Sequence, residues 1–383
     1  MMHTIYLDYN GTTPLDPEVR TAMRPFLEED FGNPSSSHWY GIKPKKAVET
    51  ARVQVAGLLG CRPEEIYFTS GGTESNNQAI KGMARALERK GRHIVTSAIE
   101  HPAVLEVCRY LEREGFETTL VAVDGLGMVD PLRVAKALRP DTILVSIMHA
   151  NNEVGTVQPV AAIAELVKAR GIVMHTDAAQ SLGKIPVDVS TLGVDMLSVA
   201  GHKLYAPKGV GALYIRDGIT PEKFCHGAGQ ERGMRAGTEN VAGIVGLGRA
   251  CEIAARGTAH AMERMKFLRD RLHRGIADGG GKIRLNGHPE YRLPNTLSLS
   301  FKGHEANRLL EAIGLEVAAS AGAACHAGDI ALSHVLEAMK TPLEWAKGTL
   351  RFSVGRMTTV EEIDRAVAAV VTALSEGATG SGR

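Results

Sequence analysis

Segment 142–148, Thr-Ile-Leu-Val-Ser-Ile-Met, is almost continuously apolar and carries no charge. A strand of this kind is typical of a parallel sheet that helices cover on both faces. Polar residues follow it at once, at positions 149–153. Because open sheets of this class bind ligands beyond the carboxyl ends of their strands, the segment predicts both a buried sheet and the edge where a site would lie.

Strand and helix patterns alternate along most of the chain, which predicts an α/β fold. A long helical pattern then spans 241–277, and after Gly279-Gly-Gly281 the composition changes. A chain of 383 residues is expected to form more than one domain. We predict a large domain at 15–255, a smaller α+β domain built from 1–14 and 256–376, and a disordered tail at 377–383.

The composition excludes several classes of protein. The formal net charge is +1 and no basic run occurs, which argues against nucleic acid as a partner. No apolar run approaches the ~20 residues of a membrane span, and the first residues lack a signal-peptide pattern. The five cysteines are scattered without a Cys-x-x-Cys pair, so neither a metal site nor a disulfide framework is expected. We expect a cytoplasmic, reducing location.

A lysine and an aspartate end two successive strand patterns. Segment 196–203 ends in Gly-His-Lys203, and segment 171–177 ends in Asp177. A lysine in an apolar, glycine-lined turn can lose its proton and form a Schiff base with an aldehyde. Pyridoxal phosphate requires such a lysine and an acid at its pyridine nitrogen. The alternatives are a surface lysine and a helix N-cap aspartate.

Two strand-to-helix junctions add polar chemistry. Ser70-Gly-Gly-Thr73 lies between a strand pattern at 66–69 and a helical pattern at 74–90, as in a phosphate cradle. A plain connecting turn is the alternative. At the next junction His101 could stack on a planar ring, or simply cap the helix that follows.

Taken in order, nine motifs closely resemble those of the cysteine desulfurases, pyridoxal-phosphate enzymes related to the class V aminotransferases. The match covers nearly the whole chain. The resemblance implies fold type I, with a large, mixed but mostly parallel α/β/α domain and a smaller α+β domain. The motifs are Asp8-Tyr-Asn-Gly-Thr-Thr-Pro14, Gly32-Asn-Pro34, Thr69-Ser-Gly-Gly-Thr-Glu-Ser75, Glu100-His101, Asn151-Asn-Glu-x-Gly155, His175-Thr-Asp-Ala-Ala-Gln180, Gly201-His-Lys203, Gln230-Glu-Arg-x-x-Arg-x-Gly-Thr238 and Arg351-Phe-Ser-x-Gly-Arg356.

The resemblance also implies roles for single residues. Lys203 would hold the cofactor aldehyde and move protons, and Asp177 would pair with the pyridine nitrogen. Thr238 would reach the phosphate from a second subunit of a homodimer. The implied catalytic residues are Lys203, Cys325 and His101, where His101 would stack on the ring. The implied cofactor-binding residues are Gly72, Thr73, His101, Asn152, Asp177, Gln180 (at the phenolic oxygen), His202, Lys203 and Thr238. The implied substrate carboxylate clamp is Asn152 and Arg351.

Cys325 would be the nucleophile that takes the sulfur as a persulfide. It lies among serine, alanine and glycine, in a stretch with side chains too small for a core. An exposed thiol there can be deprotonated and delivered to a substrate sulfur. Cys225 is the rival thiol. Cys108 and Cys251 lie on helical patterns and are predicted to be buried, and Cys61 is interpreted as structural.

The chain departs from the family pattern at three places. Ala200 stands where many desulfurases have serine, which predicts modestly weaker cofactor binding. Gly11 replaces the usual alanine. Ala-Ala-Cys-His at 323–326 replaces Ser-Ala-Cys-Thr, and His326 could lower the pKa of the thiol or be a plain loop residue. Residues 320–326 and 230–232 resemble the selenocysteine lyases even more closely.

These expectations define one main function and two alternatives. The main function is conversion of L-cysteine to L-alanine, with sulfur passing through Cys325 to an acceptor protein such as an iron–sulfur scaffold. The first alternative is a selenocysteine lyase that releases selenide. The second is a non-catalytic scaffold for sulfur transfer, against which the complete set of Lys203, Asp177, Cys325 and Arg351 argues.

Overall fold

The computed structural model describes residues 4–326 and 329–379, apart from the side chains of 323–331 and 377–379. Its largest sheet, within these residues, has seven strands in the order β2-β8-β7-β6-β5-β3-β4. β8 pairs antiparallel with β2 and β7, whereas the other neighbours are parallel. The predicted mixed, mostly parallel sheet is therefore confirmed. The strands are β2 (Ile66–Thr69), β3 (His93–Ser97), β4 (Glu117–Val121), β5 (Thr142–Ser146), β6 (Val173–Asp177), β7 (Met196–Ala200) and β8 (Gly211–Ile215).

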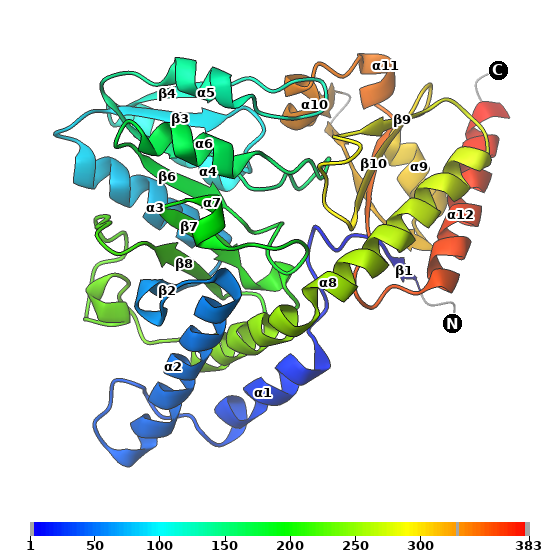
Figure 1. The fold of residues 1–383 in the computed structure, drawn as a ribbon. Coiled ribbons are helices and arrows are strands. Elements are labelled where there is room, and N and C mark those ends of the chain that lie inside the picture. The colour runs from blue at the N-terminus through cyan, green and yellow to red at the C-terminus, as the bar shows by residue number, and fades with distance from the viewer. Residues whose placement is uncertain (1–3, 327–328, 380–383) are drawn as a thin grey trace.

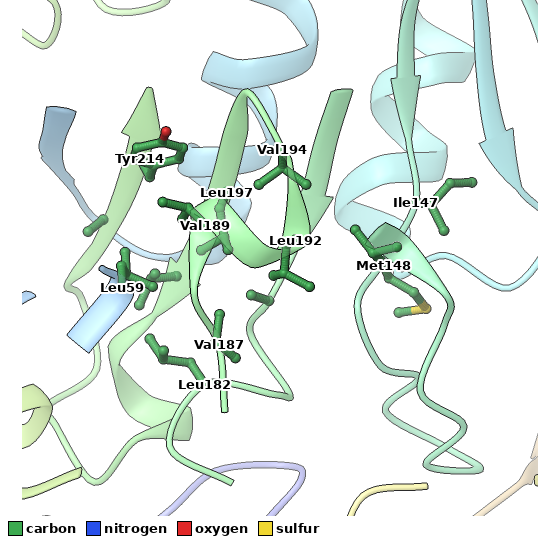
Figure 2. Close-up of a cluster of buried hydrophobic side chains, with 14 of the residues drawn as sticks. Leu59, Ile147, Met148, Leu182, Val187, Val189, Leu192, Val194, Leu197 and Tyr214 are labelled. Carbon is green, nitrogen blue, oxygen red and sulfur yellow. The ribbon is translucent and has the colours of Figure 1, made fainter. Parts of the chain in front are cut away.

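Helices cover both faces of this sheet (Figure 1). On one face α3 (Gly72–Leu87) and α4 (Pro102–Arg113) bury their apolar sides in one core. On the other face lies a second core, to which α2 (Trp39–Leu59), α5 (Pro131–Ala137), α6 (Val160–Lys168) and α7 (Val189–Leu192) contribute. Figure 2 shows part of this second core, with Leu197 of β7 and with Val189 and Leu192 of α7. The strands β3, β5, β6, β7 and β8 are thus buried along their whole length, as the apolar run at 142–148 predicted for β5, whereas the edge strand β4 is partly exposed.

A smaller antiparallel sheet has the strand order β12-β15-β10-β9 among the described residues. It shares a third core with α9 (Ala306–Ile313) and α12 (Val360–Thr379). Ile5 and Leu7, from the start of the chain, belong to this core as well. The strands are β9 (Ile283–Asn286), β10 (Thr296–Phe301), β12 (Ser320–Ala321) and β15 (Thr349–Ser353), with β1 (Ile5–Tyr6) paired to β11 (Val317–Ala318) beside them.

One long helix, α8 (Val241–Asp278), joins the two parts of the molecule. Figure 1 shows it running from α1 (Pro17–Glu28) and α2 to α12. A Cβ at Gly248 would lie 2.6 Å from Ala51 of α2, so glycine permits the close approach of the two helices. The first half of α8 packs in the core of the large sheet and the second half in that of the small sheet. The proposed boundary near residue 255 falls inside this helix and stays a prediction.

Two segments differ from what the sequence patterns indicated. The 21-residue helix α2 was not predicted at all. α12 continues to Thr379, three residues into the segment 377–383 that was expected to be disordered. Residues 380–383 lie outside the described part of the chain. In the described residues, no helix is both long and apolar enough to cross a membrane.

Among the described residues, His175 and His149 are buried close to the large sheet and have serine hydroxyls, not charged groups, as their side-chain partners. His175 of β6 bridges Ser146 Oγ at 2.8 Å and Ser198 Oγ at 3.0 Å, and burial lowers its pKa to about 3. His149 contacts Ser181 Oγ at 2.9 Å, and burial lowers its pKa to about 4. Unfolded histidine has a pKa of about 6.5, so both side chains take up a proton on unfolding at mildly acidic pH.

We therefore expect acid to destabilise the protein through these histidines. Their contribution is complete above about pH 6.5 and is lost as the pH falls toward the folded pKa. Between pH 7 and pH 5 each should lower the free energy of unfolding by about 2 kcal/mol. Urea unfolding at the two pH values should show that the free energy of unfolding falls less for His175→Asn than for wild type. The control is His260→Asn on the exposed side of α8, whose free energy of unfolding should fall with pH as much as that of wild type. An equal fall in His175→Asn would contradict a contribution from His175.

Candidate active site

A cavity of about 440 Å³ lies beyond the carboxyl ends of the parallel strands. The chain reaches it from β2, β3, β5, β6 and β7, from the segment after β1, and from β15 of the small sheet. This is the edge that the polar residues after segment 142–148 predicted. The residues that line the cavity include Asn10, Gly11, Gly72, Thr73, Asn76, His101, Asn152, Asp177, Gln180, Ala200, His202, Lys203 and Arg351.

One end of the cavity is built to receive an anion. α3 begins at Gly72, and its N-cap Gly71 has φ 150°, a conformation that favours glycine. No side chain of the described residues caps this helix, so its first N–H groups remain available to a ligand. Thr73 lies in the first turn, and His202 faces the same cavity from the turn after β7. Burial lowers the pKa of His202 to about 4, so this imidazole is a neutral hydrogen-bonding group.

Ala200 also lines this end, and a Cβ at Gly72 would lie 3.2 Å from the Ala200 Cβ. A serine at position 200 would therefore add a hydroxyl beside the helix start. Alanine supplies no such hydroxyl, and the modestly weaker cofactor binding expected from it stays a prediction.

Asp177 ends β6 and is held in the cavity by two donors. Asn76 Nδ2 donates to its Oδ2 at 2.7 Å, and the Ala179 N–H donates to its Oδ1 at 2.9 Å. The second bond is the local capping contact that was considered as an alternative, but no helix follows in the structure. Asn76 Oδ1 is buried and has no partner among the described residues. The carboxylate is thus oriented but retains capacity for a further donor, as a protonated pyridine nitrogen would supply.

Lys203 ends the short 3₁₀ turn Gly201–Lys203 that follows β7. Its Nζ donates to the carbonyl oxygens of Asn10 at 2.5 Å and Gly11 at 2.6 Å. The pKa of the amine is lowered to about 8, mainly by burial and then by the charge of Arg351. A lysine with this pKa is partly neutral near physiological pH and can react with an aldehyde.

Arg351 reaches the cavity from β15. Its guanidinium donates to Asp8 Oδ1 at 2.6 Å, Ser320 Oγ at 2.8 Å and the Asn152 carbonyl at 3.1 Å. Its Nε is buried and has no partner among the described residues. The side chain is therefore fixed in place, and Nη1, which uses only one of its two N–H groups among the described residues, still offers a donor that suits the binding of a carboxylate.

His101 and Gln180 complete the cavity wall. His101 is the N-cap of α4, where its Nδ1 accepts a hydrogen bond from the Ala103 N–H at 3.1 Å. The two interpretations of this histidine are therefore compatible, since the capped ring also lines the cavity. Gln180 Nε2 donates to the Asn10 carbonyl at 3.0 Å.

Together these groups fit pyridoxal phosphate. An uncapped helix start can bind the phosphate, Asp177 can accept from the pyridine nitrogen, and Lys203 can hold the aldehyde. All three chemistries that the cofactor requires therefore lie around one cavity.

Comparison with known proteins agrees with this geometry. The aminotransferase class-V family matches residues 5–366. The cysteine desulfurase IscS of Dictyoglomus turgidum is 50% identical over 365 residues, which cover 95% of this chain and 93% of that protein. The cysteine desulfurase IscS of Escherichia coli is 51% identical over 365 residues, covering 94% of this chain and 90% of that protein. This chain belongs to the cysteine desulfurase family of the class V aminotransferases.

A solved structure of a NifS-like protein superimposes on this desulfurase family member with a TM-score of 0.92. The two are 41% identical, and the alignment covers 98% of this chain and 100% of that one. The resemblance drawn from the nine motifs, the fold type and the use of pyridoxal phosphate are confirmed by these matches.

Among the described side chains, one predicted site residue does not line the cavity of this desulfurase. Thr238 is exposed, in the loop before α8. Cys325 lies in β13 (Ala323–His326), which pairs with β14 (Asp329–Leu332) in a hairpin. The side chains of Cys325 and His326 lie outside the described part of the structure.

The other thiols are placed away from the cavity. Cys108 and Cys251 are buried as predicted, and burial raises the pKa of both. Burial also raises the pKa of Cys61 to about 12. Cys225 donates to the Ala236 carbonyl at 3.7 Å and is not part of the lining. None of these four is therefore placed to serve as the nucleophile in the described structure.

Three polar residues at this site were not assigned a role from the sequence. Asn10 belongs to a recognised motif but had no stated function. Asn76 stands four residues before Ile80, so it is a polar residue on the apolar face of α3, which was a usable signal. Lys184 has no local pattern that distinguishes it from a surface lysine.

The lowered pKa of Lys203 makes a kinetic prediction. The rate at which the apoenzyme captures pyridoxal phosphate should rise with pH and level off above about pH 8, because only the neutral amine attacks the aldehyde. Stopped-flow absorbance of the bound cofactor measures this rate. Arg351→Met removes a cation that lowers this pKa, so its profile should move to higher pH. A wild-type rate that still rises near pH 10 would show an ordinary lysine instead.

Proposed function

We propose that this protein converts L-cysteine to L-alanine and takes the sulfur onto Cys325 as a persulfide. The observation that carries the proposal is the convergence of Lys203, Asp177 and Arg351 on one cavity, with the Cys325 hairpin attached beside Arg351. Pyridoxal phosphate, when bound, supplies an electron sink for the substrate α-carbon.

The residues of the chain divide the remaining work. Arg351 and Asn152, which both line the cavity, would bind the substrate carboxylate. Lys203 would remove the proton from the substrate α-carbon, a task that suits its lowered pKa. Asp177 would keep the pyridine nitrogen protonated, and Gln180 would donate to the phenolic oxygen. His101 would cover the ring.

The segment that carries Cys325 is anchored at both ends next to the site. Before it, Ser320 of β12 pairs with Arg351 of β15, and its hydroxyl donates to Asp8 Oδ1 at 2.9 Å. After it, the Ser333 hydroxyl bonds the Glu153 carboxylate, and the ring of His334 contacts the Glu100 carbonyl at 2.9 Å. The chain therefore enters and exits the hairpin close to residues that line the cavity.

This anchoring supports a role for Cys325 in sulfur transfer. Its thiolate would attack the sulfur of the substrate, so that an S–S bond forms while the C–S bond breaks. The electron pair of the broken bond remains on the substrate carbon, which takes up a proton and leaves as alanine. The outer sulfur of the persulfide would then be transferred to an acceptor protein, such as an iron–sulfur scaffold. We expect this transfer to take place in the cytoplasm.

We further propose that the protein acts as a homodimer. An open groove of about 710 Å³ lies between α1, α2 and α8 and has a mainly apolar lining. Large apolar side chains near it are exposed, among them Phe31, Trp39 and Ile42. A second copy would cover them, and Thr238, exposed in its own chain, could then reach the phosphate end of the partner's cavity.

The proposed nucleophile can be tested with Cys325→Ala. Alanine formation from L-cysteine should fall by more than about 100-fold, because no thiolate remains to take the sulfur, while the absorbance of the bound cofactor stays unchanged. Cys225→Ala is the matched control and should keep its activity. Full activity of Cys325→Ala would end the persulfide proposal. If the wild type turned over L-selenocysteine rapidly and L-cysteine negligibly, the selenocysteine lyase suggested by residues 320–326 would replace it.

The carboxylate clamp can be tested at Arg351. Arg351→Met should lower kcat/KM for L-cysteine by about 10- to 100-fold, mainly through KM, because a charge-assisted hydrogen bond is lost. The kcat/KM of Arg351→Lys should lie between those of wild type and Arg351→Met, since lysine keeps the charge but lacks the planar guanidinium. Arg271→Met, which removes an exposed ion pair with Asp364, is the control. Unchanged KM in Arg351→Met would show that the carboxylate binds elsewhere.

A further inference from the structure

A second lysine lies directly behind the cavity wall. Lys184 is 5% exposed and does not line the cavity. Its Nζ donates to Gln180 Oε1 at 2.8 Å and to Asn10 Oδ1 at 3.3 Å. Both acceptors belong to residues that do line the cavity. Among the described residues, the hydrogen bonds of this lysine to the site therefore run through Gln180 and Asn10.

The surroundings of Lys184 suit a neutral amine. A neutral amine has two N–H groups, and the described residues offer its Nζ two acceptors, both amide oxygens. A charged ammonium would have a third N–H to satisfy, and none of the described carboxylates forms an ion pair with it. The nearby charges are those of Lys203 and Arg351, both cationic. Burial and these two cations lower the pKa of Lys184 well below the ordinary lysine value.

Two hydrogen bonds, one of them with Lys184, fix how the Gln180 amide is oriented. Oε1 accepts from Lys184, and Nε2 donates to the Asn10 carbonyl at 3.0 Å. If the amide were flipped, Oε1 would face that carbonyl oxygen and two acceptors would oppose each other. The observed orientation leaves the second N–H of Nε2 free to serve a ligand in the cavity.

We propose that Lys184 is a positioning residue that, as a neutral amine, holds the Gln180 amide with its N–H group toward the phenolic oxygen of the cofactor. The proposal rests on the proposed role of Gln180 at that oxygen. Lys184 would thus influence the cofactor from outside the cavity, by orienting the side-chain amide of Gln180.

Asn10 gives Lys184 a second link to the site. The side chain of Asn10 accepts from Lys184, and its main-chain carbonyl accepts from Lys203. Asn295 Nδ2 also donates to Asn10 Oδ1, at 2.9 Å, so loss of Lys184 leaves this oxygen with one donor. Gln180 Oε1 has no such second donor among the described residues, and the effect of removing Lys184 should therefore appear at Gln180 first.

The test is a double-mutant cycle measured on cofactor binding. Apoenzyme is titrated with pyridoxal phosphate for wild type, Lys184→Met, Gln180→Ala and the double variant. Each single variant should weaken binding by about 10-fold, the size expected for one buried hydrogen bond, and the double variant should be no weaker than the weaker single one. The visible absorbance spectrum of the bound cofactor should change in the same way in both single variants. Lys136→Met, on the exposed side of α5, is the control and should match wild type.

Independent effects would overturn the proposal: a double variant weakened by about 100-fold, or a Lys184→Met spectrum identical to that of wild type. If Lys184→Met does not fold, the same cycle is run with Lys184→Gln, whose side chain is too short to hold both acceptors. The readout does not depend on desulfuration. A protein that binds the cofactor with the expected coupling but leaves L-cysteine intact would contradict the proposed function and keep the role of Lys184.

Discussion

The hydrogen bonds of Asn10 hold the two parts of the molecule and the site together. Asn10 is 1% exposed, and all of its polar groups have partners. Its side chain donates to Thr296 of the small sheet and to the Asn152 carbonyl of the large domain. Its carbonyl accepts from Lys203 and Gln180. Because an unpaired buried polar group costs free energy, this residue fixes the relation between the small sheet and the carboxyl ends of the large one.

Charge around the cavity follows from the same arrangement. Lys203 and Arg351 bring positive charge to a largely buried space in which Asp8 and Asp177 are the nearby acids. Burial disfavours the ammonium of Lys203, whereas Arg351 presents a planar guanidinium held by three hydrogen bonds. The amine is thereby made nucleophilic while the guanidinium remains a binder of carboxylates. A neutral Lys184 fits this balance, because a third cation behind the wall would oppose both.

The strand ends could be predicted from the sequence because their signal is local. Asp177 and Lys203 each end a run of apolar residues, and a parallel sheet gathers such ends at one edge. The glycine pair before α3 was equally readable, since a turn of this geometry favours glycine. The order of the motifs then gave further cavity residues, including Arg351 from the far end of the chain.

What could not be predicted depends on contacts between distant segments. α2 was missed because small residues such as Gly41, Ala51 and Ala56 form much of its buried face, with Pro44 inside the helix, so hydrophobic periodicity is weak. Asn10 and Lys184 look like ordinary polar residues until residues far along the chain surround them. Their importance comes from burial and from partners at positions 152, 180, 203 and 295, and no local pattern encodes these.

The two sheets supply different parts of the proposed chemistry. The large sheet supplies the groups that suit the cofactor from strands buried on both faces, which are rigid supports. The small sheet supplies Arg351 from β15, and β12, paired with that strand, leads into the Cys325 hairpin. The residue proposed to bind the substrate and the thiol proposed to attack it are thus attached to adjacent strands, and a shift of the small sheet would move both together. Asn10 lies where such a shift would have to begin, so the hydrogen bonds that join the two parts also keep the nucleophile in register with the substrate it is proposed to attack.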